Sequence, residues 1–251
     1  MAFDFREWFT ALSNVGGRYF VLASVSFFIF YKLFPKHFIS IKIQKSFPRK
    51  KNYYRDIAYS TISIAIFATV AYLCFKVLRP YNHINYGEIG NPYWYGLSFV
   101  WMFFLHDFYF YWSHRAMHSK LLFKKVHLVH HKSTNPTPWT SYAFHPLEAI
   151  IEAGIAPLVA FTLPVHRSAF FIFMLFQIVY NVYGHLGYEL YPKNFTRTWL
   201  GKWINTGTAH NQHHKNFVGN YGLYTLIWDR MFGTLRADYE ETFEKVRSSQ
   251  G

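Results

Sequence analysis

Long apolar runs alternate along the chain with short basic segments. Residues 19–34 and 57–78 are the clearest runs, and each approaches the roughly 20 apolar residues that a helix needs to cross a bilayer. Residues 93–112 form a third, aromatic-rich run, and residues 147–183 form two apolar halves that turn back near Pro164. The pattern predicts an all-α integral membrane protein with about four transmembrane or re-entrant helices.

The basic residues indicate how the protein is oriented in the membrane. Lys and Arg gather in residues 36–55, 115–132 and 193–202, whereas residues 81–92 contain neither. Cytoplasmic loops carry an excess of Lys and Arg, so the three basic segments are expected on the cytoplasmic side. The polar segments that follow the third run and the hairpin should then form a cytoplasmic helical cap.

The composition supports a membrane protein and argues against other classes. Apolar residues make up 51% of the chain, aromatic residues 22% and charged residues only 16%, which fits neither a disordered chain nor an ordinary soluble domain. The net charge of +13 suggests nucleic-acid binding, but the apolar runs contradict a soluble basic protein. Loops that face an anionic membrane surface explain the charge better, and no nucleic-acid partner is expected. The single cysteine, Cys74, excludes an internal disulfide and a cysteine-based zinc site.

Histidine is the unusual residue type, with 14 copies. His37, His83 and His166 stand alone in loops. Eight of the others form three clusters with spacings of three or four residues: His114 and His118; His127, His130 and His131; His210, His213 and His214. Residues three or four apart share one face of a helix, so each cluster can direct two or three imidazoles at one point. Imidazole is the commonest metal-binding side chain, and the repeated spacing predicts a metal centre.

The number of histidines indicates more than one metal ion. A tetrahedral ion takes about four protein ligands, so eight histidines fit two ions better than one. His185 lies where the hairpin returns to the cytoplasmic side and is expected to be a further ligand. His106, Asp107 and His145 are candidates for a supporting role, or for anchoring a loop in the case of His145. Asp107 can fix the tautomer of a ligand, whereas His106 is about 12 Å of helical rise from His114.

Several familiar catalytic motifs do not occur. The sequence has neither the Glu-x-x-His pairs of soluble di-iron bundles nor the His-Glu-x-x-His motif of zinc proteases. It also has no glycine-rich nucleotide loop and no Gly-x-Ser-x-Gly elbow. Carboxylates near the clusters are few: Glu148, Glu152, Glu189 and Asp229.

These motifs resemble those of the fatty acid hydroxylase superfamily, the integral-membrane group that includes sterol desaturases. The resemblance covers residues 94–236. Besides the three histidine clusters, it includes the His106-Asp pair, the Pro-Thr-Pro and Phe-His-Pro elements of residues 136–146, and the segment from Asn220-Tyr-Gly to Trp228-Asp-Arg. The Pro-Thr-Pro and Phe-His-Pro elements are most similar to the sterol C-5 desaturase branch.

The resemblance implies a membrane-bound non-haem di-iron oxidoreductase. Such an enzyme uses O2 and two external electrons to hydroxylate or desaturate a C–H bond of a sterol or fatty-acyl lipid held in the bilayer. Nine histidines are implied as ligands of the two irons: His114, His118, His127, His130, His131, His185, His210, His213 and His214. Some relatives have a fused cytochrome b5 domain that this sequence lacks, so a separate cytochrome b5-like or ferredoxin-like electron carrier is expected.

On this interpretation, residues 1–90 form N-terminal membrane helices and residues 91–240 form the catalytic region of one domain. The protein is expected in a bacterial inner membrane or the endoplasmic reticulum, with its active site on the cytoplasmic side. Two other hypotheses stay open: a metal-transporting membrane protein, and a non-catalytic protein with zinc in the histidine site. A transporter would want polar ligands along several spans, whereas these clusters lie beside the spans. Hydroxylation and desaturation begin with the same hydrogen abstraction, so the sequence does not separate them.

Overall fold

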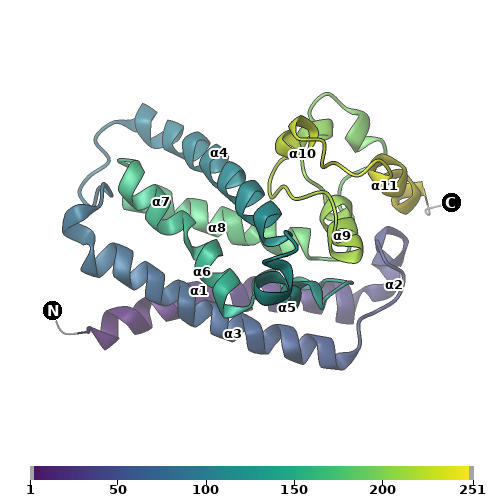
Figure 1. The fold of residues 1–251 in the computed structure, drawn as a ribbon, viewed down its shortest axis with the longest axis horizontal. Helices are drawn as coiled ribbons and strands as arrows, with labels where there is room; N and C mark the ends of the chain where they lie inside the picture. Colours follow the sequence, from purple (N-terminus) through teal and green to yellow (C-terminus); the bar gives the residue numbers. More distant parts are fainter. Residues whose placement is uncertain (1–2, 249–251) are drawn as a thin grey trace.

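The computed structural model describes residues 3–248, which fold into a helical bundle with a smaller helical cap at one end (Figure 1). The described residues contain three isolated β-bridges and no strand, so the all-α prediction is confirmed. The α-helices are α1 (Phe5–Phe27), α2 (Pro35–Phe38), α3 (Lys50–Tyr72), α4 (Pro92–Met117), α5 (Leu128–His131), α6 (Pro146–Ala153), α7 (Ile155–Thr162), α8 (Arg167–Gly184), α9 (Gly207–Asn216), α10 (Ile227–Met231) and α11 (Tyr239–Ser248).

Two long helices, α1 and α3, pack against each other along the bundle. Each continues into a short π-helical turn, so the two rods run over Phe5–Leu33 and Lys50–Val77. With 29 and 28 residues, both are long and apolar enough to cross a membrane. The Tyr19 hydroxyl links them by donating to Ser60 Oγ at 2.8 Å. These rods correspond to the first two predicted spans.

The first helix begins at Phe5, well before the apolar run that starts at residue 19. The Asp4 side chain caps it by accepting a hydrogen bond from the backbone three residues on. Within the helix, the Asn14 amide donates to the Thr10 carbonyl at 2.8 Å, and Arg18 Nε donates to the Asn14 carbonyl at 3.0 Å. Because these polar side chains bond to their own helix, they do not interrupt it.

Helix α4 carries the third predicted span and the first histidine cluster on one continuous rod. The Asn91 side chain caps its start, and Pro92 occupies its first turn, where the missing N–H is harmless. Its outward face exposes large apolar side chains: Leu97, Val100, Trp101, Phe104, Phe108 and Trp112. Among the described residues, α1 and α3 alone meet the length and hydropathy required of a span. The predicted number of about four crossing or re-entrant helices therefore stays a prediction.

The predicted hairpin consists of three helices instead of two. Its turn, between α7 and α8, contains Pro164 as expected. Its first half is divided at Gly154 into α6 and α7. A Cβ atom at Gly154 would collide with the hydroxyl of Tyr109 on α4, which donates to the Ile151 carbonyl at 2.6 Å. The absence of a side chain at this position therefore permits close packing of α4 on the hairpin.

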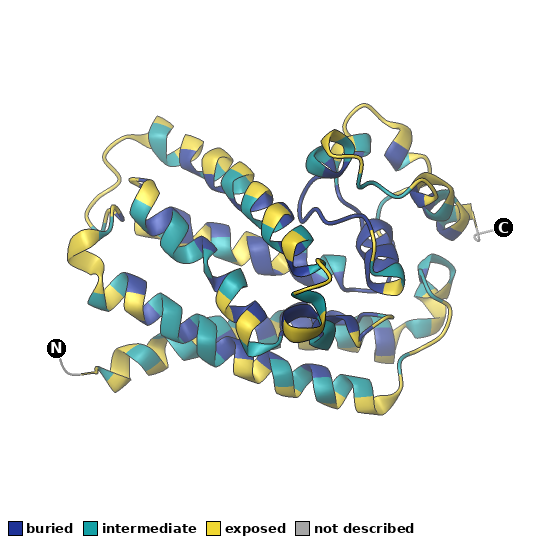
Figure 2. Ribbon diagram, in the orientation of Figure 1, coloured by how far each residue is buried: buried dark blue, intermediate teal, exposed yellow. Residues whose placement is uncertain are grey.

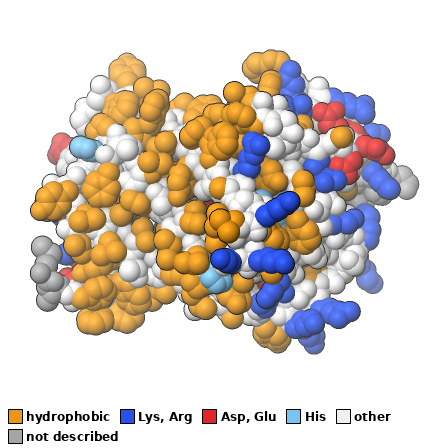
Figure 3. Space-filling view, viewed as in Figure 1, with side chains coloured by type: hydrophobic (Ala, Val, Ile, Leu, Met, Phe, Trp, Pro, Cys, Tyr) orange, Lys and Arg blue, Asp and Glu red, His pale blue; other side chains and the backbone are white. Residues whose placement is uncertain are grey.

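The cap covers the end of the bundle at which the histidine-bearing segments meet. Its helices share a small core formed by Ala209, Leu226, Tyr239 and Phe243. Helix α9 and the neighbouring loops are buried, whereas much of the bundle surface is exposed (Figure 2). On the face shown in Figure 3, hydrophobic side chains cover the bundle, and Lys and Arg gather at the cap end. This division suits a bundle in a bilayer with its cap at the polar surface.

Candidate metal centre

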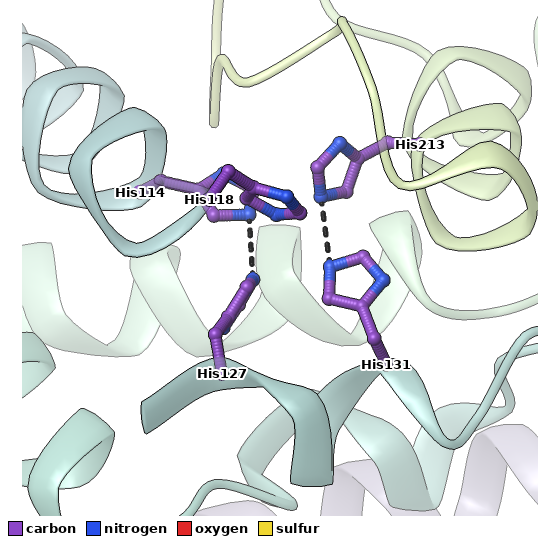
Figure 4. Close-up of side chains that lie close together, drawn as sticks. All are labelled: His114, His118, His127, His131 and His213. Carbon is purple, nitrogen blue, oxygen red and sulfur yellow. Dashed lines mark hydrogen bonds between the residues drawn. The ribbon is translucent and has the colours of Figure 1, made fainter. Parts of the chain in front are cut away.

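Nine histidine rings meet where the bundle joins the cap. One set, here the five-histidine group, has ligand nitrogens within 4.8 Å of one another and is drawn in Figure 4: His114, His118, His127, His131 and His213. A second set with the same property, here the four-histidine group, consists of His130, His185, His210 and His214. Every histidine that the sequence suggested as a ligand belongs to one of the two groups.

Helix geometry decides which rings join the five-histidine group. His114 and His118 are four residues apart at the end of α4 and lie on one face. After a π-helical turn, His127 and His131 are again four residues apart and join the same group. His130, which lies between them in the sequence, joins the four-histidine group. One short helical segment therefore contributes to both groups.

Helix α9 also contributes to both groups, with two rings in the four-histidine group and one in the five-histidine group. His210 and His214, four residues apart, join the four-histidine group, while His213 lies 3.0 Å from His131 through their Nε2 atoms in the five-histidine group. His185 follows α8 directly and completes the four-histidine group. Its Nε2 lies 2.9 Å from His210 Nε2 and 3.2 Å from His214 Nε2. The arrangement therefore offers two neighbouring points at which a metal ion can be held.

Hydrogen bonds at the outer ring nitrogens fix the tautomers. Four Nδ1 atoms each lie within 3.0 Å of a backbone carbonyl oxygen: His114 of Tyr221, His185 of Asn181, His213 of Gly219 and His214 of Ser133. A carbonyl oxygen only accepts hydrogen bonds, so Nδ1 must carry the proton. In the neutral ring this leaves a lone pair on Nε2, the atom that faces the other histidines.

The inward nitrogens lie too close together for neutral rings alone. The Nε2 atoms of His185 and His214 are 3.2 Å apart, although both rings carry their proton on Nδ1. Two lone pairs then face each other with no hydrogen between them, which is repulsive. The Nε2 atoms of His114 and His127 lie 3.1 Å apart in the other group. A cation among these nitrogens converts the repulsion into coordination, so the donor sets fit metal ions.

Burial keeps the rings in the neutral, metal-binding form. It lowers the pKa of His185 to about 4. It also holds the pKa values of His131, His210 and His214 well below the ordinary value, and neighbouring rings add to this because a charge on one disfavours a charge on the next. A set of neutral nitrogen donors suits iron, zinc, copper and nickel.

A buried carboxylate supports the five-histidine group. Glu148 Oε1 lies 2.6 Å from His127 Nδ1, and both side chains are almost fully buried. Among the described residues, no other carboxylate hydrogen-bonds to any of the nine rings. His145 caps the same helix, α6, by accepting a hydrogen bond from the Leu147 N–H at 3.3 Å, so its place in the structure is that of a loop anchor. A carboxylate behind a metal-binding imidazole orients the ring and strengthens it as a donor.

Asp107 and His106 lie outside both groups and hold the loop before α10. Asp107 accepts hydrogen bonds from the Tyr224 N–H at 2.7 Å and from Trp228 Nε1 at 3.0 Å, and not from a histidine ring. His106 is buried, and its Nδ1 lies 3.0 Å from the Tyr224 hydroxyl. Both residues therefore act on the segment that follows the third histidine cluster.

A cavity of about 380 Å³ runs through the bundle and ends beside residues that contact the four-histidine group. On α8 it is lined from Arg167 to Asn181, which corresponds to about 21 Å of helical rise. Asn181 accepts the hydrogen bond of His185, and the ring of Phe144, also in the lining, lies 5.0 Å from the ring of His130. The inner end of the cavity is therefore next to the histidines. Much of the remaining wall is apolar, with Phe67, Phe75, Phe170 and Met174 among its residues.

The fold and the site together define an all-helical protein with membrane-compatible helices, a long, largely apolar cavity and a histidine centre that can hold metal. Residues 99–234 match the family model for fatty acid hydroxylase. The chain is 30% identical over 235 residues to lathosterol oxidase of Homo sapiens, covering 90% of this chain and 73% of the human protein. The chain belongs to the fatty acid hydroxylase family, whose matched members are named as oxidative lipid-modifying enzymes.

Two fungal relatives extend the comparison. A Delta(7)-sterol 5(6)-desaturase of Gibberella zeae is 33% identical over 166 residues, covering 65% of this chain and 45% of that protein. A probable Delta(7)-sterol 5(6)-desaturase of Neurospora crassa is 30% identical over 232 residues, covering 91% of this chain and 63% of that protein. The chain thus spans less than two thirds of these fungal proteins. No solved structure matches it.

Some contributors to the site could not be found from the sequence. Four rings are oriented by backbone carbonyls, which every residue carries and which leave no pattern. Asp229 accepts hydrogen bonds from the N–H groups of Tyr221 and Gly222 and so fixes the loop that holds His114. Asp229 and Glu148 could be noticed only as rare carboxylates near the clusters. Their roles depend on contacts between distant segments.

Proposed function

We propose that this chain is a membrane-bound non-haem di-iron oxidoreductase that uses O2 and external electrons to hydroxylate or desaturate a lipid C–H bond. The proposal depends above all on one observation, two neighbouring imidazole groups of which one, the four-histidine group, lies next to the inner end of a long, largely apolar cavity. The sterol-oxidising names of its relatives support a lipid as substrate.

The nine histidines are the proposed ligands, five for one iron and four for the other. Iron held there would supply the redox chemistry that activates O2, which zinc cannot do. The chain itself keeps the rings neutral by burial, and in four of them a backbone carbonyl keeps Nδ1 protonated so that Nε2 is free to bind. Glu148 performs the same task for His127 through a side-chain oxygen. The buried setting also keeps water away from a reactive centre.

The cavity is the proposed path of the lipid to the metals. Its apolar walls on α3 and α8 can bind a hydrocarbon skeleton, and its inner end at Phe144 and Asn181 brings a carbon close to the histidines. Holding that carbon in place is the chain's main contribution to the rate. Residues 1–90 supply part of these walls, so we propose that they act with residues 91–240 as one domain.

We assign the histidine centre to the cytoplasmic side of a bacterial inner membrane or the endoplasmic reticulum. The Lys and Arg side chains at the cap end support this side (Figure 3). The same basic surface suits an acidic partner, and a separate cytochrome b5-like or ferredoxin-like carrier is the proposed electron donor. Exposed Lys124 and Lys125 lie just before His127 and are candidates for its docking.

Comparative lipid mass spectrometry tests the proposed function. Cells that express the chain should accumulate, only in the presence of O2, a lipid heavier by one oxygen or lighter by two hydrogens. Replacing a central ligand by His131→Ala or His213→Ala should abolish this product while the protein stays inserted in the membrane. His37→Ala is the matched control, because His37 is an exposed histidine outside the centre. An unchanged lipid profile, or full product from His131→Ala, would contradict the proposal.

A further inference from the structure

Helices α8 and α6 each contribute a residue that holds a histidine ring of the centre. On α8, the Asn181 carbonyl accepts a hydrogen bond from a ring of the four-histidine group, and on α6, Glu148 accepts one from a ring of the five-histidine group. Gln177 and Glu152 lie one helical turn, about 6 Å, further into the bundle on the same helix faces. Both side chains line the cavity. Two polar groups from different helices therefore lie one turn from the residues that hold the rings.

Gln177 is a buried amide without a partner. The residue is only 9% exposed, its Oε1 is buried with no hydrogen bond, and no described residue bonds to its side chain. Burying an unpaired amide costs free energy, so an apolar side chain would stabilise the empty cavity better. On one side of Gln177 the lining of α8 is apolar, with Met174 and Phe170, and on the other side Asn181 uses its amide to bond to the Ser141 carbonyl. Its position among them points to a polar group on the molecule that fills the cavity.

Glu152 indicates which kind of polar group the bound molecule carries. Among the described residues, Glu152 has no hydrogen-bond or ion-pair partner, although it lines the same cavity. A carboxyl group next to the ligand disfavours an anionic group at this end of the cavity, and Gln177 Oε1 only accepts hydrogen bonds. Arg18 and Arg167 also line the cavity, but they lie further from the histidines, near Phe171 and at the start of α8. A hydroxyl fits either side chain, because it donates one hydrogen bond and accepts others.

We propose that Gln177 binds a hydroxyl group of the lipid substrate, with Glu152 as a second polar contact in the same cavity, and that this hydroxyl lies close to the carbon that is oxidised. The inference rests on the proposed function and narrows its substrate class. The hydroxyl position is about one helical turn from the residues that hold the rings, so a lipid whose only polar group is a distant headgroup does not fit. Sterol alcohols and hydroxylated long-chain lipids share the required chemistry.

Equilibrium binding to the iron-loaded protein in lipid nanodiscs, without an electron donor, tests this inference. Two matched pairs separate the two sources of the hydroxyl: lathosterol against cholest-7-ene, and an N-acylsphinganine against its 3-deoxy analogue. We expect the wild type to bind one alcohol at least about tenfold more tightly than its deoxy partner. Gln177→Met, which keeps the volume and removes the hydrogen bond, should bring that ratio close to one, and Glu152→Leu should lower it.

Two controls distinguish a loss of hydroxyl recognition from a loss of protein stability. Met174→Leu changes the same cavity wall without a polar group and should keep the wild-type ratio. Gln177→Met should keep the iron content and should match or exceed the thermal stability of the wild type, because it removes an unpaired buried amide. A residue needed only for folding would instead destabilise the protein when replaced.

Three results would overturn the inference: wild-type protein that binds neither alcohol, wild-type protein that binds alcohol and deoxy analogue equally, or Gln177→Met protein that keeps the preference. Lipid turnover measured in parallel separates this failure from a failure of the proposed function. Turnover without discrimination rejects only the hydroxyl site. Discrimination without O2-dependent turnover rejects only the oxygenase.

Discussion

At the scale of single residues, the centre depends on atoms that hold the histidines from behind. Carbonyl oxygens bind four of the rings, and the His127 ring is held by a carboxylate, Glu148. The spacing of His114 and His118 was readable from the sequence because a helix repeats every 3.6 residues. The division of His130 from His131 into different groups was not, because it depends on where α9 and the His185 loop pack.

Glu148→Gln should weaken metal binding without removing the histidines. The amide oxygen can still accept from His127 Nδ1, but an amide cannot ionise, so the negative charge that Glu148 can place behind a metal-bound ring is lost. Changes of this kind typically cost about 10- to 100-fold in metal affinity. Chelator competition on the purified protein measures the effect, with the exposed Glu241→Gln as the control. Equal affinity in the two variants would show that the contact has no role in the centre.

The metal-free protein should lose stability as the medium becomes acidic. The folded pKa of His185 is about 4, below its ordinary 6.5, because burial disfavours the charged ring. Between these values the unfolded chain binds a proton that the folded chain does not, so stability falls as pH drops from about 6.5 towards 4. The other buried rings act in the same direction and outnumber the buried carboxyls, such as Glu189 and Asp229, whose raised pKa values act in the opposite direction. The Tm of the metal-free protein should therefore be lower at pH 5 than at pH 7.5, and a flat profile would contradict burial of neutral rings.

At the scale of elements, the sequence predicted the apolar part of a helix and the turn at a proline. It did not predict where polar side chains extend a helix, or where contact with another helix breaks one. The run at residues 19–34 marked the apolar part of α1. The helix itself starts at Phe5, because polar side chains there bond to the backbone of their own helix. The turn at Pro164 was predictable because proline ends a helix. The break at Gly154 was not, since it results from contact with α4.

Gly154→Ala should destabilise the protein by about 1–3 kcal/mol, because the new methyl group collides with the Tyr109 hydroxyl. Gly17→Ala is the matched control: it lies inside α1, and a Cβ atom there meets nothing within 4 Å. That change should be neutral or stabilising by up to about 1 kcal/mol. Thermal unfolding in detergent compares the two variants. If both shift Tm equally, Gly154 is not required for the approach of α4.

At the scale of the whole molecule, a hydrophobic bundle and a basic cap meet at the histidine centre (Figures 1 and 3). The bundle contributes α4, which carries His114 and His118, and the cavity that ends next to the four-histidine group. The cap contributes α9 with three rings. Neither part alone holds a complete group, because each group takes rings from both. Composition and histidine spacing predicted these parts, but their meeting depends on the long-range packing of segments about 100 residues apart, as for His114 with the Tyr221 carbonyl.

Counting iron in the purified protein tests the central claim most directly. After anaerobic loading, elemental analysis should find about two irons for each chain. His131→Ala should reduce binding in the five-histidine group alone, and His210→Ala in the four-histidine group alone, so each variant should keep about one iron. A wild-type protein that retains no iron, or a single ion whose binding depends equally on both groups, would contradict two separate metal sites.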